Sequence, residues 1–465
     1  MKFELIIGSV ITIISLIAVS AFSGKITKNK KGATSFLVAG AIMGTLVGGS
    51  STIGTAQLAY QYGMSAWWFT LGGGVACLIL TLAYAKPLYR GGHTTLTGFV
   101  TSEYGKKNGV ISAIFSSIGS FINIISQLIA ATAVIAVVFP NLSLSFSLIF
   151  SAIIMILYIV FGGVKGSGFV GIFKMLLLYI SMLSVGLLVL YFCGGLSEFA
   201  ENVRKIENPE NVHFYSLFAR GVGKDLGACL SLVLGVVTTQ SYAQAIFMAE
   251  SEKAAIKGAL ISTVLVPLIG IGGILVGLYM RSMHPEIVSK TALTYFITQY
   301  MPPALGGVVL GALFIAVVGT GAGLTLGIAT VVKNDVLPML KCIKKEKVCS
   351  KLTEKKLIIV ILFFACLLSM GTFGDTILNF AFMSMGLRGA ALFAPLSFAI
   401  FSPGRVSPKY AMLSIILGPL IVLVFNLWNL LPFDPLFLGV LVSGFIMFIG
   451  LFKRRECNFV EGKKK

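Results

Sequence analysis

The chain has 465 residues, of which 57% are hydrophobic and only 11% are charged, whereas roughly a quarter of an average soluble domain is charged. This composition excludes a soluble globular protein, because the charged residues are too few to cover the surface that such a fold exposes. The net charge of +19 would fit a nucleic-acid-binding protein, but the positions of the basic residues exclude that function.

Apolar runs bounded by charged or turn residues predict an all-α polytopic membrane protein with about thirteen transmembrane helices, since about 20 apolar residues span a bilayer. The first run, residues 5–21, is not followed by a small-residue cleavage site, so we expect a retained helix instead of a signal peptide. The predicted spans are 4–23, 35–61, 65–85, 109–138, 143–162, 168–193, 222–248, 257–281, 303–332, 357–374, 376–402, 410–431 and 436–452.

The distribution of Lys and Arg predicts the orientation of these spans. With the N-terminus outside, 27 of the 36 basic residues fall in the loops that then face the cytoplasm or in the C-terminal tail, and seven fall outside. Loops on the cytoplasmic side of membrane proteins carry such an excess. We therefore expect a multi-pass protein of the cell (inner) membrane with its C-terminus in the cytoplasm. The positive charge reflects topology and contact with membrane lipid, not nucleic acid.

The residue types that commonly bind metals or catalyse reactions are scattered along the chain. The seven cysteines form no close pairs and the three histidines do not cluster with them, which predicts neither disulfides nor a zinc site. A membrane enzyme needs carboxylates or histidines that converge at membrane depth, yet none of the seventeen acidic residues falls in the middle of a predicted span. We expect no enzymatic activity and no cofactor.

The second predicted span is interrupted at its centre. The stretch GTLVGGSSTIGT, residues 44–55, contains four glycines and five hydroxyl residues, and each glycine weakens a helix by about 1 kcal/mol relative to alanine. One interpretation is close helix packing through small residues. The other is a discontinuous helix whose freed backbone groups bind an ion and a solute.

A second polar interruption favours the discontinuous helix. The stretch TTQSYAQ, residues 238–244, lies near the middle of a span five spans later. Two interrupted helices at matching positions indicate an inverted-repeat transporter. We expect a single transporter domain over 1–465, with a peripheral helix in 1–34, repeats in 35–193 and 222–402, and two peripheral helices with a cytosolic tail in 403–465. The loop 194–221 predicts an amphipathic external helix.

Five segments, in order and spacing, resemble the sodium:solute symporter family. This resemblance covers nearly the whole chain, and it implies a LeuT-like fold of five-plus-five core helices within the APC superfamily. It also implies secondary active, cation (Na⁺)-coupled symport of a small polar organic solute by alternating access. The segments are GGSSTIGTAQLAYQYGMSAWWFTLGGG, AKPLYRGGHTTLTGFVTSEYG, FGGVKG (a Gly-Gly turn before the fifth core helix), TTQSYAQAIFMAESEKAAIKGA and LNFAFMSMGLRGAALFAPL.

The resemblance further implies a sodium site between the broken first core helix and the eighth. All-oxygen coordination suits a hard cation such as sodium. Gly319 lacks the hydroxyl that the family has there, so a water molecule or Thr325 would have to replace it. Carried over onto this sequence, the ligand positions are Gly44, Val47, Ala316, Gly319 and Thr320.

Lys174 is the second departure from the family. It lies inside a predicted span, where the family often has Gln, one turn after Gly171, which aligns with a common Asp. An intramembrane lysine is costly and usually functional. Either Lys174 extends to the cytoplasmic interface, or its ammonium reaches the sodium site and replaces the metal. The second alternative predicts proton-coupled or cation-independent transport.

Arg388 also falls inside a predicted span. It would either pair with an anionic solute or contact backbone carbonyls at the inner gate, and we favour the gate. Polar side chains at a helix break suit a small hydrogen-bonding solute. The expected solute-binding residues are Ser50, Ser51, Gln57, Gln240, Tyr242 and Gln244.

A channel and a transport-like sensor are the remaining alternatives. Nothing in the sequence resembles a selectivity-filter repeat, and about twelve residues follow the last predicted span, too few for a signalling domain. The sequence does not identify the solute, the coupling ion (Na⁺ or H⁺) or the oligomeric state.

Overall fold

The computed structural model describes residues 3–27, 32–139, 141–206, 212–338, 354–370, 377–428 and 434–452. Within these residues the chain is built of helices, and the one β-type contact is an isolated bridge between Ala33 and Ala249. The first half contains α1 (Phe3–Thr27), α2 (Ser35–Leu46), η1 (Ser50–Gly54), α3 (Thr55–Tyr62), η2 (Gly63–Trp67), α4 (Trp68–Ile79), η3 (Leu80–Tyr84), α5 (Ala85–Arg90), α6 (Leu96–Tyr104), α7 (Lys106–Val138), α8 (Leu144–Cys193) and α9 (Leu196–Arg204).

The second half begins after the short segment that follows α9. Its elements are α10 (Val222–Thr238), α11 (Gln240–Phe247), α12 (Glu252–Met283), η4 (Ser289–Thr291), α13 (Ala292–Tyr300), α14 (Pro303–Val331), η5 (Val332–Val336), α16 (Glu354–Ser369), α17 (Ile377–Phe401), α18 (Pro408–Trp428) and α19 (Leu436–Phe452).

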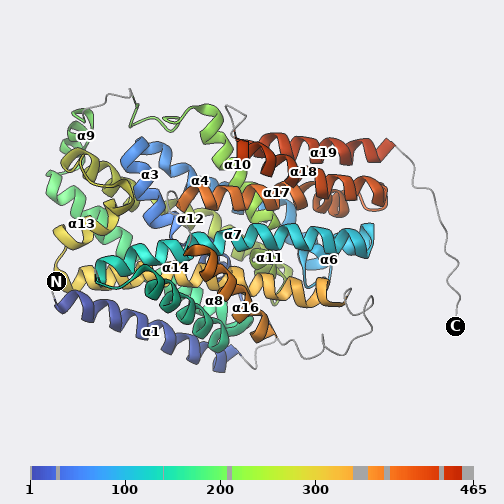
Figure 1. Cartoon of the computed structure of the whole chain (residues 1–465), viewed down its shortest axis with the longest axis horizontal. Coiled ribbons are helices and arrows are strands. Elements are labelled where there is room, and N and C mark those ends of the chain that lie inside the picture. The colour runs from blue at the N-terminus through green and yellow to red at the C-terminus, as the bar shows by residue number, and fades with distance from the viewer. Residues whose placement is uncertain are drawn as a thin grey trace, which may run out of the picture.

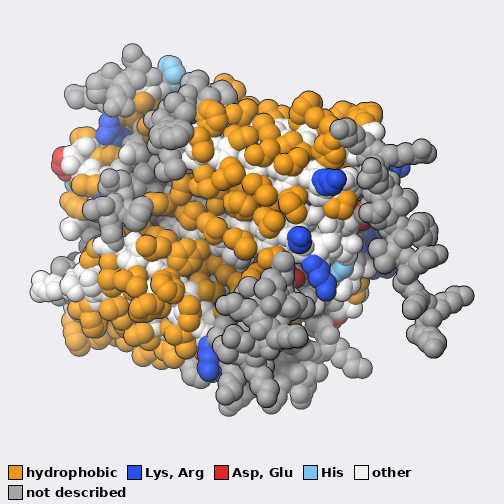
Figure 2. Space-filling model, turned by 45° about the vertical axis from the view of Figure 1, so that its right-hand side comes forward, with side chains coloured by type: hydrophobic (Ala, Val, Ile, Leu, Met, Phe, Trp, Pro, Cys, Tyr) orange, Lys and Arg blue, Asp and Glu red, His pale blue; other side chains and the backbone are white. Residues whose placement is uncertain are grey.

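These helices form a multi-pass membrane protein. Eight of the described helices are long and apolar enough to cross a bilayer, or nine if the bent pair α10 and α11 counts as one span. Three shorter apolar helices cover Ser35–Leu46, Leu144–Val160 and Leu436–Phe452. Hydrophobic side chains form a broad face on the outside of the bundle (Figure 2), as contact with lipid requires. The predicted total of thirteen spans stays a prediction.

The predicted spans 143–162 and 168–193 fall in one helix, α8, so the expected Gly-Gly turn between them is not seen as a break in the helix. The two apolar parts of α8 contact opposite ends of α1. Tyr158 accepts a hydrogen bond from Ser20 near the end of α1. Phe192, 34 residues later, packs edge-on against Tyr300, which immediately precedes α14 near the opposite end of α1.

The bundle has a core and two edges (Figure 1). At one edge α1 packs on α14 and α8, and at the other α18 and α19 pack on each other and on α17. Between them lie α2, α7, α10, α12 and α14, which bring the two broken helices together. Outside the bundle, α9 and the segment after it hold Phe214 in a buried position, while Tyr215 is half exposed.

Loops predicted to be cytoplasmic gather at one end of the bundle, which we call the basic end. Its contacts join segments far apart in the sequence. They are Arg90 Nε to Glu252 Oε2 (2.6 Å), Thr97 Oγ1 to Asp335 Oδ2 (2.6 Å), Gly404 N to Glu103 Oε1 (2.6 Å) and Lys333 Nζ to Glu354 Oε2 (3.1 Å).

Candidate functional site

The first predicted break is confirmed. Helix α2 ends at Leu46, Val47 is extended (φ −89°, ψ 103°), and the chain resumes as the π-helical turn η1 and then α3. Backbone groups freed at membrane depth must find partners within the protein. The N–H of Gly48 donates to Ser51 Oγ (3.0 Å), and the N–H of Gly49 donates to Gln127 Oε1 on α7 (3.0 Å).

The second predicted break is also confirmed. Helix α10 ends at Thr238, Thr239 is extended (φ −91°, ψ 120°), and α11 leaves at 47° to α10. The hydroxyl of Thr239 donates back to the carbonyl of Gly235, and the hydroxyl of Ser241 donates to the carbonyl of Gly323 on α14 (2.8 Å). The second break therefore contacts α14, the eighth core helix.

Lys174 lies at the first break. Its side chain is fully buried, and its Nζ atom donates to the carbonyl oxygen of Gly44 (2.5 Å) and to Thr320 Oγ1 (2.9 Å). The Thr320 hydroxyl in turn donates to the carbonyl of Val47 (3.1 Å). The interfacial position that we considered for Lys174 is therefore wrong, because the side chain extends into the core and meets groups predicted to bind sodium.

Close packing of α2 on α8 brings Lys174 to this position. A Cβ added to Gly171 would lie 1.9 Å from the carbonyl oxygen of Gly40, and one added to Gly44 would lie 2.8 Å from the Cα of Gly171. Only glycine allows this approach. Small-residue packing and a broken helix are thus both present in this stretch, at successive turns.

Gly319 provides the space for the lysine side chain. A Cβ at this position would lie 3.4 Å from Lys174 Nζ and 3.2 Å from Lys174 Cδ, and the second distance is tighter than ordinary van der Waals contact. Gly319 therefore contributes space where the family resemblance predicts a hydroxyl. The hydroxyl of Thr325 donates to the carbonyl of Gly321 on its own helix (2.7 Å), and its role as a replacement ligand stays a prediction. Ala316 is buried on α14 one turn before Thr320.

Two of the predicted solute-binding residues have a buried oxygen with no hydrogen-bond partner among the described residues, namely Ser50 Oγ and Gln57 Oε1. Both lie on the part of the first broken helix that follows the break, in η1 and α3. Ser51, by contrast, stabilises the break, because its hydroxyl accepts from Gly48 and donates to the carbonyl of Leu46 (3.3 Å).

The three predicted residues of the second broken helix have different surroundings. Gln240 holds the loop before α6, through the carbonyl of Thr94 (3.0 Å) and the N–H of Leu96 (2.9 Å). Gln244 lies further toward the basic end and donates to Thr330 (3.2 Å). Tyr242 is buried within electrostatic range of Arg388.

Arg388 lies on α17 with 1% of its surface exposed. Its Nε atom donates to the carbonyl of Ser384 (3.2 Å), and its Nη1 atom donates to Ser120 Oγ on α7 (3.3 Å). The aliphatic part packs on Gly119, where an added Cβ would lie 2.5 Å from Arg388 Cγ.

Sequence reasoning missed the contribution of α7. Gln127 supports the first break, and its Nε2 atom donates to Asn123 Oδ1 one turn earlier (3.1 Å). The sequence does contain a pattern that could have indicated this contribution, namely an Asn and a Gln four residues apart on one face of an otherwise apolar helix.

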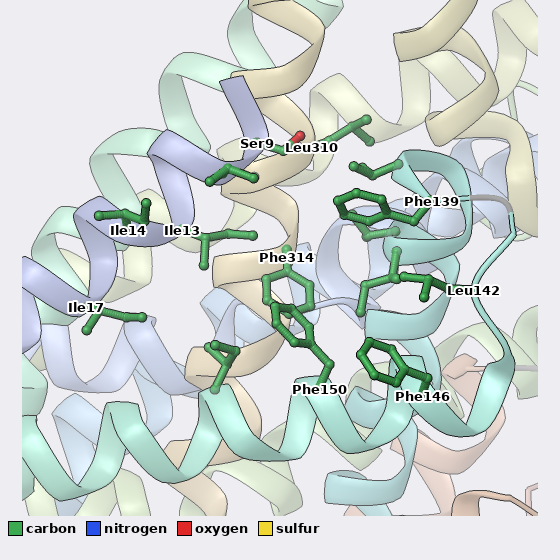
Figure 3. A pocket seen from close by; sticks show the side chains of 16 residues that line it. Ser9, Ile13, Ile14, Ile17, Phe139, Leu142, Phe146, Phe150, Leu310 and Phe314 are labelled. Carbon is green, nitrogen blue, oxygen red and sulfur yellow. The ribbon is translucent and has the colours of Figure 1, made fainter. Parts of the chain in front are cut away.

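An apolar pocket of about 380 Å³ lies between α1, α7, α8 and α14 (Figure 3). Its only polar side chain, Ser9, already donates to the carbonyls of Leu5 and Gly307. The labelled side chains that surround the pocket are otherwise hydrocarbon. It therefore offers no group that could orient a polar solute.

Two helices broken at membrane depth, packed against a continuous eighth core helix, define a LeuT-like secondary transporter. The chain belongs to the sodium:solute symporter family, which matches residues 27–418. It is therefore a secondary active symporter of a solute. The resemblance noted from the sequence is confirmed at the level of the family and of the fold.

Individual relatives support this assignment. The chain is 28% identical over 151 residues to the uncharacterized symporter YwcA of Bacillus subtilis (strain 168), and this match covers 32% of the chain but only 29% of the relative. Among solved structures, it is similar to a Na⁺-coupled sialic acid symporter in a substrate-bound outward-open state (TM-score 0.76, 16% identity, 97% of each chain). It is also similar to MHP1, a nucleobase-cation-symport-1 family transporter, in a closed conformation with bromovinylhydantoin bound (TM-score 0.62, 12% identity, 90% of this chain and 92% of that one). At these identities the two structures show the fold.

Proposed function

We propose that this symporter is coupled to protons and that the side-chain amine of Lys174 takes the place of the family's sodium ion. The observation that carries the proposal is the pair of hydrogen bonds from Nζ to Gly44 O (2.5 Å) and Thr320 Oγ1 (2.9 Å). An ammonium group has three donors and no acceptor, so a set of carbonyl and hydroxyl oxygens suits it as well as it suits a hard cation.

The amine connects the elements that a sodium ion would connect. Through Lys174, α8 is joined to the end of α2 and to the middle of α14. When protonated, the amine makes charge-assisted hydrogen bonds, which are roughly twice as strong as neutral ones. Loss of the proton weakens both connections, so binding and release of a proton would bias the relative position of the first and eighth core helices.

Sodium fits this set of groups poorly. An ion in contact with Gly44 O and Thr320 Oγ1 would have to displace the Lys174 Nζ atom that already binds both. Gly319 supplies no oxygen in compensation.

The solute in this proposal is a small polar organic molecule bound at the two breaks. The unpartnered oxygens of Ser50 and Gln57 support this position, because a buried polar group without a partner is costly and a solute would supply one. We further propose that the basic end faces the cytoplasm and that the protein resides in the cell (inner) membrane, in keeping with the excess of basic residues.

The test is uptake into proteoliposomes. A solute would first be identified by counterflow, in sodium and in choline. Uptake of that solute would then be measured with and without sodium, and with and without an inward proton gradient. We expect the proton gradient to drive uptake in choline and sodium to add nothing.

The variant Lys174→Gln separates coupling from binding. It keeps a polar side chain of the family's type but cannot carry a proton, so we expect counterflow to persist and the response to the proton gradient to disappear. A strict sodium requirement in the unmodified protein would contradict the proposal.

A further inference from the structure

The apolar pocket of Figure 3 has buried walls on three helices. Leu310 and Phe314 of α14 line it and are buried, and the ring of Phe314 stacks on that of Phe150 from α8, with 6.1 Å between the ring centroids. Val134 and Val138 of α7 form a further buried wall. The interior of the pocket is therefore hydrocarbon.

The mouth of the pocket lies on the outside of the bundle. Three of the residues that line the pocket have exposed side chains, namely Val10 and Ile14 of α1 and Phe146 near the beginning of α8. Exposed hydrophobic side chains also form the broad outer face of this membrane protein (Figure 2). The pocket is therefore continuous with the surface that contacts lipid, and it opens between α1 and α8.

The pocket lies at the depth of the lipid acyl chains. Helix α14 begins at Pro303 and continues to the basic end, where Asp335 accepts a hydrogen bond from Thr97. At 1.5 Å per residue, Leu310 and Phe314 lie about 10 and 17 Å along the helix from Pro303. The hydrocarbon core of a bilayer is about 30 Å thick, so the pocket belongs to the half of the membrane away from the basic end.

Hydrocarbon is the occupant that suits this site. Apolar cavities stay dry, and a cavity of about 150 Å³ already holds benzene, so about 380 Å³ has room for part of one extended chain. A helix of a second copy is about 10–12 Å wide with its side chains and does not fit. Lipid tails are as apolar as the pocket, so a chain is held by dispersion contacts that the walls would otherwise lack.

We propose that the pocket binds one acyl chain of a membrane phospholipid, which enters between α1 and α8 and packs against Phe314. Phe314 lies about 9 Å before Thr320 on the same helix, so the bound chain contacts the core helix that carries a hydrogen-bond partner of Lys174. The lipid site is separate from the proposed solute site at the two breaks, and it does not depend on the coupling ion.

The test is photocrosslinking of the full-length protein in vesicles of phosphatidylethanolamine and phosphatidylglycerol. The probe is a phosphatidylglycerol with a diazirine on one acyl chain, and the adducts are located by mass spectrometry of peptides. Leu187 on α8 is 57% exposed and Phe314 is 2% exposed, so a chain that only surrounds the protein labels Leu187 and does not reach Phe314. We expect adducts on Leu187 and also on Leu310 or Phe314.

Two variants fill the pocket from different sides. Val138→Trp fills it from α7 and should lower the labelling of Leu310 and Phe314 at least about tenfold, with the labelling of Leu187 unchanged. Val10→Trp fills it from the mouth and serves if the first variant does not fold. Val264→Trp is the matched control, because Val264 on α12 is exposed and lies outside the pocket, and it should be labelled as the unmodified protein is.

The proposal is overturned if neither Leu310 nor Phe314 carries an adduct in the unmodified protein, or if their labelling survives both filling variants. It is also overturned if a diazirine-bearing free fatty acid labels Phe314 and the phospholipid probe does not. If neither variant folds, the comparison of Phe314 with Leu187 in the unmodified protein decides.

Discussion

The Nζ atom of Lys174 lies 2.5 Å from the carbonyl oxygen of Gly44, at the last turn before the first broken helix is interrupted. A side chain from one helix thus binds the backbone group that the break of another helix leaves available. The contact places a titratable group among the residues that the family resemblance predicts to bind sodium.

Restoring the family's hydroxyl should change the ion dependence. In Lys174→Gln combined with Gly319→Ser, the space left by the amine is lined by the oxygens of Gly44, Val47 and Thr320 together with a new serine hydroxyl, a set that suits sodium. We expect uptake by this double variant to be stimulated by sodium, severalfold or more, in proteoliposomes. Gly319→Ser alone should reduce uptake, because its Cβ would lie 3.2 Å from Lys174 Cδ.

Gly444→Ser serves as the control for that experiment. It also adds a serine to a helix, α19, but nothing lies within 4 Å of the new Cβ, so uptake should keep its original ion dependence. A double variant that remains insensitive to sodium would show that these oxygens do not form a sodium site even without the amine.

The contact between α2 and α8 should tolerate no added methyl group. Gly171→Ala would place a Cβ 1.9 Å from the carbonyl oxygen of Gly40, and overpacking of this kind costs about 1–3 kcal/mol. Gly444→Ala has free space and gains helix propensity. We expect a lower thermal midpoint for Gly171→Ala and an unchanged or higher one for Gly444→Ala. Equal midpoints would mean that the two helices can separate at no cost.

The first break should depend on Gln127. Gln127→Leu removes the acceptor of the Gly49 N–H, and a buried donor left without a partner costs about 1–3 kcal/mol. We expect a lower thermal midpoint and weaker solute binding, with partial recovery in Gln127→Glu, which keeps an acceptor oxygen. Ser117→Ala, on the same helix, removes a hydroxyl that has no partner among the described residues and should have little effect. If both variants behave alike, the bond from Gln127 does not stabilise the break.

Asp434, just before α19, should make stability depend on pH. Burial raises the pKa of this carboxyl above its ordinary value, although a hydrogen bond from the Leu436 N–H opposes the shift. A raised folded-state pKa favours the neutral form, so the contribution of this group to stability is present at acidic pH and is lost as the pH rises through that pKa. Asp434→Asn keeps the acceptor for Leu436, so it should be more stable at pH 7, with a difference that shrinks toward pH 4.

Glu286 has a pKa shifted in the opposite direction from that of Asp434, so it serves as a comparison when the thermal midpoint is measured against pH. Its pKa is lowered by a hydrogen bond from its own backbone N–H and by the neighbouring His284, so its contribution is present at neutral pH and is lost on acidification. Glu286→Gln should not gain stability at pH 7. If the thermal midpoint of Asp434→Asn changes with pH in parallel with that of the unmodified protein, the raised pKa of Asp434 is contradicted.

Both helix breaks could be predicted because their cause is local. Glycines and hydroxyl residues at the middle of apolar runs weaken the helix at Val47 and Thr239 regardless of the rest of the fold. The roles of neighbouring polar residues could not be predicted in the same way. Ser51 and Gln240 lie at the breaks as expected, but their side chains hold backbone groups of the protein, a choice that depends on which segments happen to lie opposite.

The sequence by itself determined the membrane class, the family and the location of the two breaks, because hydrophobicity and helix propensity act over short stretches of chain. It left two alternatives open for Lys174. Only the tertiary structure showed where the amine lies, because the direction of that side chain depends on how closely two helices approach. Gly40, Gly44 and Gly171 let α8 approach α2, and Gly319 on α14 leaves the space that the lysine fills, so the amine lies against Gly44 and Thr320 instead of the membrane interface.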